Sequence, residues 1–228
     1  MQFDATVPTV ADRIAQTVVR SYLEPEVEPV FHPDSYGYRP GRSAHQALGA
    51  CRERCWKSDW VLDMDIRKFF DTVPWDLTLK AVAHHTDRRW ILLYVERWLK
   101  APLQQEDGSL VERDCGTPQG SAISPLLANL FMHYAFDAWM AREFPAVQFE
   151  RYCDDIIVHA RSERQALQLR AMVASRLAEC GLELTSERPA SCTARTPTGA
   201  AHMSTRRLTS WDTRSARGCR RADSGSTS

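Results

Sequence analysis

Two adjacent carboxylates stand out among the side chains that could carry chemistry. Asp154 and Asp155 follow Tyr152-Cys153 and lie between two short strand-like segments. Holding two adjacent carboxylates together costs free energy unless a cation neutralises them. Mg²⁺ suits such a site because it prefers hard oxygen ligands. A polar hairpin turn would also explain an Asp-Asp pair, and these four residues alone do not decide between the two readings.

A second acidic pair occurs earlier, in Asp63-Met64-Asp65-Ile66. Side chains two apart on a strand point the same way, so both carboxylates could face one surface of a sheet. In a strand otherwise built from apolar residues, this placement is costly unless something uses it. An exposed sheet face is the competing interpretation. Together, the two acidic sites indicate two-metal phosphoryl transfer, which needs carboxylates from separate parts of the chain.

The elements that must position these carboxylates can be read from periodicity and capping signals. Alternating or continuous apolar residues predict strands, and Ser, Asp or Pro at helix starts and Gly at helix ends predict helices. The sequence predicts strands at 60–66, 147–152, 156–160 and 182–184, a hairpin turn at 106–109, and helices at 10–30, 43–57, 76–85, 87–100, 124–142 and 162–180. The pattern predicts an α/β (α+β) fold in which a β-hairpin and helices pack on one face of a sheet.

Four ordered motifs resemble those of reverse transcriptases encoded by group II introns. The resemblance covers residues 7–187, and the order of the motifs makes it specific. The matching segments are Pro8-Thr9-Val10-Ala11-Asp12-Arg13 with Tyr36-Gly37-Tyr38-Arg39-Pro40-Gly41-Arg42-Ser43, then Asp63-Met64-Asp65-Ile66-Arg67-Lys68-Phe69-Phe70-Asp71, then the Pro118-Gln119-Gly120 segment, and finally Tyr152-Cys153-Asp154-Asp155. The resemblance implies a right-hand polymerase palm with partial fingers, RNA-directed DNA synthesis with Mg²⁺, and RNA template, DNA primer, dNTPs and intron RNA as partners.

The resemblance also implies a role for each matching position. It makes Asp65, Asp154 and Asp155 the catalytic metal ligands, in preference to Asp63, with Ile66 giving a backbone carbonyl. Phe70 would lie under the nucleotide sugar and select deoxynucleotides, although a core position is the alternative. The remaining expectations are Gln119, Gly120 and Arg13 at the nucleotide, and Arg39 and Arg42 at template or phosphate, where a solvated surface role is equally open.

Charge divides the chain into two regions. Its 29 basic and 29 acidic residues balance, but residues 188–228 hold eight Arg against two acids, so residues 1–187 carry a net charge of −6. The first region is expected to be the folded domain and the second a disordered basic tail.

Seven cysteines without a disulfide framework favour a reducing, cytoplasmic setting, and no apolar run could span a membrane. Cys51 and Cys55 lie four apart, but no zinc site is predicted because two more ligands are not apparent nearby.

The tail is interpreted as the product of a frameshift near Glu187–Arg188. In a shifted frame, the codons for residues 208–215 can encode Asp-Phe-Leu-Gly-Tyr-Thr-Phe, which resembles a motif that the family has at this point. The coding DNA would test this hypothesis. An evolved basic RNA-binding tail is the competing interpretation.

The family pattern also implies that the basic N-terminal fingers region and the thumb are absent. We therefore expect little or no processive synthesis from this chain alone, because catalysis requires primer, template and nucleotide to be held together. One alternative is an inactive remnant or an RNA-binding fragment. Another is the reverse transcriptase of a retron, a diversity-generating element or a CRISPR-linked system.

Overall fold

A computed structural model describes residues 8–104, 108–118, 120–185 and 193–194. The chain divides into two compact units. Of the described residues, we call those within 1–32, 66–143 and 173–184 the helical unit, and those within 33–65, 144–172 and 185–228 the sheet unit. Each unit has a hydrophobic core of its own.

The helical unit is built from amphipathic helices around an apolar core. Its core includes Leu23 of α1, Val82 of α4, Val95 of α5 and Leu127 of α6, all essentially inaccessible to solvent. A short antiparallel hairpin follows α5. The elements are α1 (Val10–Val27), η1 (Glu28–Val30), α3 (Phe69–Thr72), α4 (Trp75–His85), α5 (Arg89–Lys100), β2 (Leu103–Gln104), β3 (Leu110–Val111), α6 (Ser124–Met132), η2 (His133–Asp137) and α7 (Ala138–Glu143).

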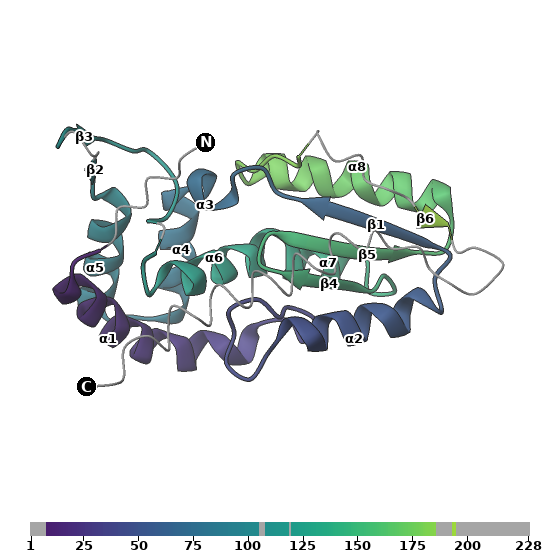
Figure 1. Cartoon of the computed structure of the whole chain (residues 1–228), viewed down its shortest axis with the longest axis horizontal. Helices are drawn as coiled ribbons and strands as arrows, with labels where there is room; N and C mark the ends of the chain where they lie inside the picture. Colours follow the sequence, from purple (N-terminus) through teal and green to yellow (C-terminus); the bar gives the residue numbers. More distant parts are fainter. Residues whose placement is uncertain (1–7, 105–107, 119, 186–192, 195–228) are drawn as a thin grey trace. The chain divides into compact units, whose positions relative to one another are not determined.

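The sheet unit contains an antiparallel sheet with strand order β4-β5-β1-β6. The strands are β1 (Trp60–Asp65), β4 (Phe149–Tyr152), β5 (Asp155–Ala160) and β6 (Thr193–Ala194), and α2 (Ala44–Cys55) runs alongside β4 in Figure 1. The last helix, α8 (Glu163–Glu179), begins in this unit and continues into the helical unit.

Helix α2 covers one face of the sheet. Apolar side chains of the helix, among them Ala44 and Ala47, pack with Val61 of β1, Tyr152 of β4 and Ile157 of β5. In the strand register Val61 lies opposite His159, and Glu150 lies opposite Ile157. Because side chains alternate along a strand, Glu150, Tyr152, Asp155, Ile157 and His159 belong to this face.

Several local predictions are confirmed. Ser43 caps α2 through a complete capping box, in which its hydroxyl accepts from the Gln46 amide and the Gln46 side chain accepts from the Ser43 amide. The strands around the Asp154–Asp155 pair and the strand at 60–65 form as expected. Gly108 has a positive φ between β2 and β3, as a turn residue should, although 106–107 lie outside the described residues.

Other local predictions are wrong. Asp76 and Asp87 do not cap the helices at 75–85 and 89–100, whose N-cap residues are Pro74 and Arg88. The helix predicted at 124–142 forms at 124–143, and the prediction missed only the π-helical turn η2 within it. No strand forms at 182–184. Among these residues only Leu184 forms a β-bridge, an isolated one with Ile66.

The stretch 188–228 is described only at Thr193 and Ala194, which pair with Val61 and Trp60 of β1. The rest of the tail lies outside the described residues, so the prediction of a disordered or frameshifted tail stays a prediction. Among the helices described, none combines the length and apolar character needed to cross a membrane.

Candidate active site

Asp65 and Asp155 are placed directly opposite each other by the pairing of β1 and β5. They are Cα partners at the end of the antiparallel register. Partners of this kind have their Cβ atoms about 5 Å apart on the same face, and two like charges so placed repel. The carbonyl of Asp65 accepts a hydrogen bond from the Thr185 amide at 2.9 Å, which fixes the end of β1. This end of the sheet therefore concentrates negative charge.

Asp154 lies in the two-residue turn that joins β4 to β5. Tyr152 and Asp155 form the closing pair of the hairpin, with Cys153 and Asp154 between them. Cys153 has φ of 62°, the left-handed value that a type II′ turn needs at its first central residue. Burial raises the pKa of the Cys153 thiol well above its ordinary value, so this side chain stays neutral. The turn thus presents Asp154 next to Asp155 without adding another charge.

Gly37 allows the preceding loop to pack on this turn. A Cβ added to Gly37 would lie 2.6 Å from the amide nitrogen of Cys153 and 3.2 Å from the carbonyl carbon of Tyr152. The ring of Tyr38 lies 6.3 Å from that of Tyr152. Only a residue without a side chain lets the two backbones approach this closely.

Arg151 ties the turn to the same loop from inside the sheet unit. Its side chain is completely buried, and it donates to the carbonyl of Cys153 at 3.0 Å and to the hydroxyl of Ser35 at 2.7 Å. The backbones of Asp34 and Tyr36 also hydrogen-bond Arg151, so residues 34–36 run beside β4. Charged hydrogen bonds in a buried setting hold their partners in one geometry. The carboxylate-bearing turn is therefore fixed on both sides.

The three aspartates fit a divalent cation by donor type and by backbone position. Carboxylate oxygens are the hard ligands that Mg²⁺ prefers, and they come here from β1 and from the turn before β5. Asp65 and Asp154 are half-buried, whereas Asp155 is fully buried. Within the described residues, their oxygens are not among the ligand atoms that gather within 4.8 Å of one another. The strand register brings the backbone of the three aspartates together at one end of the sheet, and their carboxylates would have to turn toward a shared ion.

Ile66 and Phe70 belong to the helical unit. Ile66 directly follows Asp65 and is buried, and it pairs with Leu184. Phe69 is buried, whereas Phe70 is half-buried, with the two rings 5.3 Å apart in an edge arrangement. Phe69 is therefore a core residue, and Phe70 keeps part of its ring accessible.

The segment before Gly120 packs against the backbone at Phe70. A Cβ on Gly116 would lie 2.8–2.9 Å from the carbonyl oxygens of Asp71 and Phe70, and the Thr117 amide donates to the Phe70 carbonyl at 2.7 Å. Gly116 also has φ of 85°, which favours glycine. These contacts bring the segment that leads to Gly120 next to Phe70. Gln119, predicted at the same pocket, lies outside the described residues.

Helix α1 is connected to the same segment through Gln16. This side chain is 2% exposed and accepts a hydrogen bond from the amide of Ala122 at 2.9 Å. Arg13 is exposed and lies three residues before Gln16, so the two share a face of α1. Arg13 therefore lies on the side of α1 that meets the segment after Gly120. Gly120 itself has a positive φ of 80°.

The two arginines predicted at nucleic acid differ in exposure. Arg39 is largely buried and donates to the carbonyl of Ser35 at 2.7 Å. Arg42 is exposed, with its guanidinium 5.7 Å from the centre of the Tyr36 ring. Arg39 therefore has a local structural contact, and Arg42 presents its charge to solvent.

Sequence reasoning missed four residues that hold the site. Gly37, Arg151, Gly116 and Gln16 were not singled out, although each makes a contact that positions a predicted residue. The glycine between two tyrosines was the available signal for Gly37. The roles of Arg151 and Gln16 depend on contacts with residues far away in the sequence, which no local pattern reveals.

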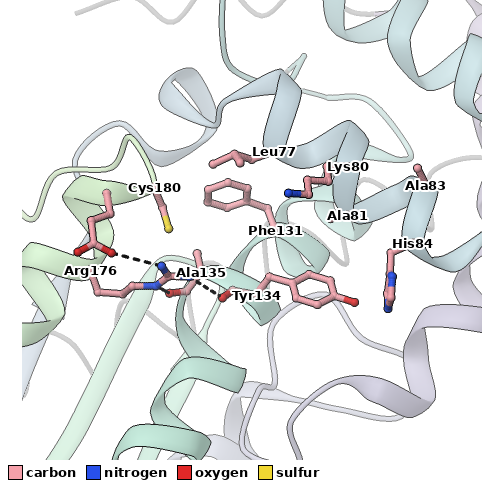
Figure 2. A pocket seen from close by; sticks show the side chains of 11 residues that line it. Leu77, Lys80, Ala81, Ala83, His84, Phe131, Tyr134, Ala135, Arg176 and Cys180 are labelled. Carbon is pink, nitrogen blue, oxygen red and sulfur yellow. Dashed lines mark hydrogen bonds and ion pairs between the residues drawn. The ribbon is translucent and has the colours of Figure 1, made fainter.

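A separate cavity of about 610 Å³ lies within the helical unit. Figure 2 shows Phe131, Leu77 and Lys80 around it, with Arg176 hydrogen-bonded to the carbonyls of Tyr134 and Ala135. Its lining is mainly apolar and contains none of the residues predicted for the metal or the nucleotide. The cavity is therefore not part of the candidate active site.

Comparisons with known proteins agree with this geometry. The profile of the family described as reverse transcriptase (RNA-dependent DNA polymerase) matches residues 3–198. The group II intron-encoded protein LtrA of Lactococcus lactis is 33% identical over 127 residues, which cover 56% of this chain and 21% of LtrA. Protein YkfC of Escherichia coli is 35% identical over 155 residues, which cover 64% of this chain and 37% of YkfC. The chain thus spans well under half the length of these relatives.

Solved structures show the same fold. Apo telomerase from Candida tropicalis, truncated from its C-terminal domain, superposes with a TM-score of 0.57 at 14% identity, covering 75% of this chain and 39% of the telomerase chain. This likeness confirms the expected mixed α/β palm and fingers fold. With the family profile extending over most of the chain, the chain belongs to the reverse transcriptase (RNA-dependent DNA polymerase) family.

Proposed function

We propose that this chain carries the nucleotidyl-transfer centre of an RNA-directed DNA polymerase, with Asp65, Asp154 and Asp155 as its Mg²⁺ ligands. Its substrates would be dNTPs, a DNA primer and an RNA template, with group II intron RNA as the natural template. One observation carries the proposal: Asp65 lies opposite Asp155 in the strand register, beside the turn that holds Asp154. Such a concentration of carboxylates is costly unless divalent cations neutralise it.

The protein's part in this chemistry is to position oxygen donors. The three carboxylates, with the backbone carbonyl of Ile66, would hold the ions. When bound, Mg²⁺ supplies activation of the primer 3′-hydroxyl and neutralises charge on the triphosphate and its leaving group. Arg151 and Gly37 act as positioning residues, because they fix the turn through Cys153.

The nucleotide would lie against Phe70, Gln119 and Gly120, with Arg13 near its triphosphate. Support comes from the helical unit, where the Gly116–Thr117 backbone contacts Phe70 and where α1 meets the same segment through Gln16. The partly accessible ring of Phe70 would collide with a ribose 2′-hydroxyl and so favour deoxynucleotides.

For the template, exposure favours Arg42 over Arg39. Arg42 can offer its charge to a phosphate, whereas the guanidinium of Arg39 already donates to Ser35 and holds the loop.

A single-nucleotide addition assay tests the proposal. The chain is used in molar excess over poly(rA)/oligo(dT), so that processivity is not required, and addition of dTTP is followed with Mg²⁺. We expect slow addition that the Asp154→Ala variant loses by about a thousand-fold, since removing an electrostatic group at such a centre has effects of this order.

The chain offers a matched pair of controls in β1. Asp65→Asn should abolish addition, while Asp63→Asn, two residues away on the same strand face, should retain most of it. Circular dichroism and urea unfolding would show that each variant is folded. Equal addition by the wild type and Asp154→Ala would contradict the proposal, as would equal losses in Asp63→Asn and Asp65→Asn.

A further inference from the structure

Four buried side chains with metal-binding atoms meet within the sheet unit, separately from the aspartates. Cys51 and Cys55 come from α2, Glu150 from β4 and His159 from β5. Ligand atoms of Cys51, Glu150 and His159 all lie within 4.8 Å of one another. The sulfur atoms of Cys51 and Cys55 are 3.9 Å apart. None of the four is more than 4% exposed.

The fold explains why these side chains converge. Residues four apart lie on the same face of a helix, so both cysteines of α2 point toward the sheet. Glu150 is opposite Ile157 in the β4–β5 register, and His159 lies two residues beyond Ile157, so the two side chains share the face that α2 covers. About a hundred residues separate the cysteines from the other two groups, which is why local spacing gave no zinc prediction.

The donor set has the composition of a zinc site. Thiolate sulfur and imidazole nitrogen are the ligands that Zn²⁺ prefers in structural sites, and a carboxylate is also accepted. Two thiolates on a tetrahedral zinc, at about 2.3 Å each, lie about 3.8 Å from one another, which the Cys51–Cys55 separation of 3.9 Å already satisfies. Oε2 of Glu150 and Nε2 of His159 are 2.7 Å apart in a hydrogen bond. A metal bound to both atoms would replace this hydrogen bond once the two atoms had moved slightly apart.

An outer residue supports the same arrangement. Arg54, on α2 between the two cysteines, donates to Oε1 of Glu150 at 2.7 Å and to both carboxylate oxygens of Asp34 at 2.8 Å. Outer hydrogen bonds of this type orient a ligating carboxylate. Two thiolates, the carboxylates of Glu150 and Asp34, and the Arg54 guanidinium would carry a charge of −3, and Zn²⁺ would reduce it to −1, which lowers the cost of burying the group.

Both sulfurs would bind the ion as thiolates, because the thiolate is the form of cysteine that binds metal.

We propose that Cys51, Cys55, His159 and Glu150 form a structural Zn²⁺ site that ties α2 to the hairpin of β4 and β5. This hairpin carries Asp154 in its turn, so the metal would stabilise the strands beneath the catalytic carboxylates. The site is independent of the aspartates and of the proposed polymerase activity.

The first test measures metal in the full chain. The protein is purified from zinc-supplemented cultures without chelators, and its zinc is quantified by inductively coupled plasma mass spectrometry. We expect about one zinc per chain, as one four-ligand site requires. The Cys51→Ser and Cys55→Ser variants should lose nearly all of it, and Cys180→Ser, which removes a buried thiol of the helical unit, should keep it. A Cys192→Ser/Cys219→Ser variant should also keep it, which excludes the cysteines near the C-terminus.

A second measurement does not depend on whether those variants fold. Zinc is removed from the wild type with a chelator, and Co²⁺ is added. Bound cobalt should give thiolate-to-metal charge-transfer bands and the intense visible bands of tetrahedral coordination, and adding Zn²⁺ should abolish them and raise the melting temperature by several degrees. A wild-type chain without stoichiometric zinc and without cobalt bands would overturn the proposal, and so would zinc retained in Cys51→Ser/Cys55→Ser.

Discussion

The proposed ligand atoms of this chain divide by chemical hardness. Asp65, Asp154 and Asp155 would provide only oxygen, whereas the proposed zinc site of Cys51, Cys55, Glu150 and His159 would add two sulfur atoms and an imidazole. Hard oxygen ligands suit Mg²⁺, and soft thiolates suit Zn²⁺. Both sets belong to the sheet unit, so the choice of side chains, and not the fold alone, would keep the two metals apart.

Phe70 provides the most specific prediction for a single residue. Replacing it with alanine removes the ring that would collide with a ribose 2′-hydroxyl. The preference for dTTP over UTP on poly(rA)/oligo(dT), measured as the ratio of kcat/KM values, should fall by about 10- to 100-fold, the range expected when a pocket loses a steric contact of a few kcal/mol.

Phe70→Tyr is the matched control, because it keeps the ring and should keep the preference. If Phe70→Ala lowers addition of both nucleotides equally, the ring has a packing role instead. Phe70 is half-buried and its ring contacts that of the buried Phe69, so an equal loss would mean that the ring acts mainly through this packing.

At the scale of elements, the carboxylate-bearing turn depends on the loop that precedes α2. Gly37 approaches the Cys153 amide so closely that a methyl group there would overlap the backbone. Gly37→Ala should therefore lower the free energy of unfolding in urea by roughly 1–3 kcal/mol, the usual cost of overpacking.

Gly49 supplies a control of opposite expected sign. It lies within α2, where an added Cβ would meet no atom within 4 Å. Gly49→Ala should leave stability unchanged or raise it by about 0.5–1 kcal/mol, because alanine favours helix. A Gly37→Ala variant as stable as Gly49→Ala would show that the loop does not pack on the turn as described.

These elements also show what the sequence can predict. Strands β1, β4 and β5 and the N-cap at Ser43 follow from local periodicity and capping, and the order of the four motifs indicated the family. The strand register that sets Asp65 against Asp155 does not follow from local pattern, nor does the pairing of residues 34–36 beside β4. Contacts between distant residues also explain why the Cys51–His159 cluster was not predicted.

The wrong helix starts have a different cause. Asp76 and Asp87 have the side chains of N-caps, but α4 begins at Trp75 after Pro74, and α5 begins after Arg88. Both aspartates still lie near the start of a helix, where negative charge is favourable. Intrinsic capping preference thus located the helices to within two residues and failed only at the boundary itself.

For the whole molecule, charge is the main constraint on nucleic-acid binding. The chain is neutral overall, with residues 1–187 at −6 and residues 188–228 at +6. A net negative region repels a phosphate backbone unless positive groups gather locally, and Arg13 and Arg42 are two exposed candidates. We therefore expect the arginines of 188–228 to supply most of the nonspecific attraction to RNA, whatever the origin of that segment.

Neutralising those arginines in the full chain tests this expectation. Glutamine would replace all eight: Arg188, Arg195, Arg206, Arg207, Arg214, Arg217, Arg220 and Arg221. Fluorescence anisotropy with a labelled oligo(rA) across a salt series should show affinity falling about ten-fold or more at low salt. The dependence of log K on log salt should also become shallower, because each lost phosphate contact removes about 0.7 from the slope for single strands.

A variant with lysine at the same eight positions keeps the charge and separates electrostatics from arginine-specific contacts. It should bind with nearly the wild-type salt dependence, since counterion release depends on charge. Unchanged affinity and slope in the glutamine variant would place the RNA-binding charge within residues 1–187 instead. In that case, substituting Arg13 and Arg42 in the glutamine variant should remove the remaining affinity for RNA. One series of measurements thus distinguishes RNA binding by residues 188–228 from RNA binding by residues 1–187.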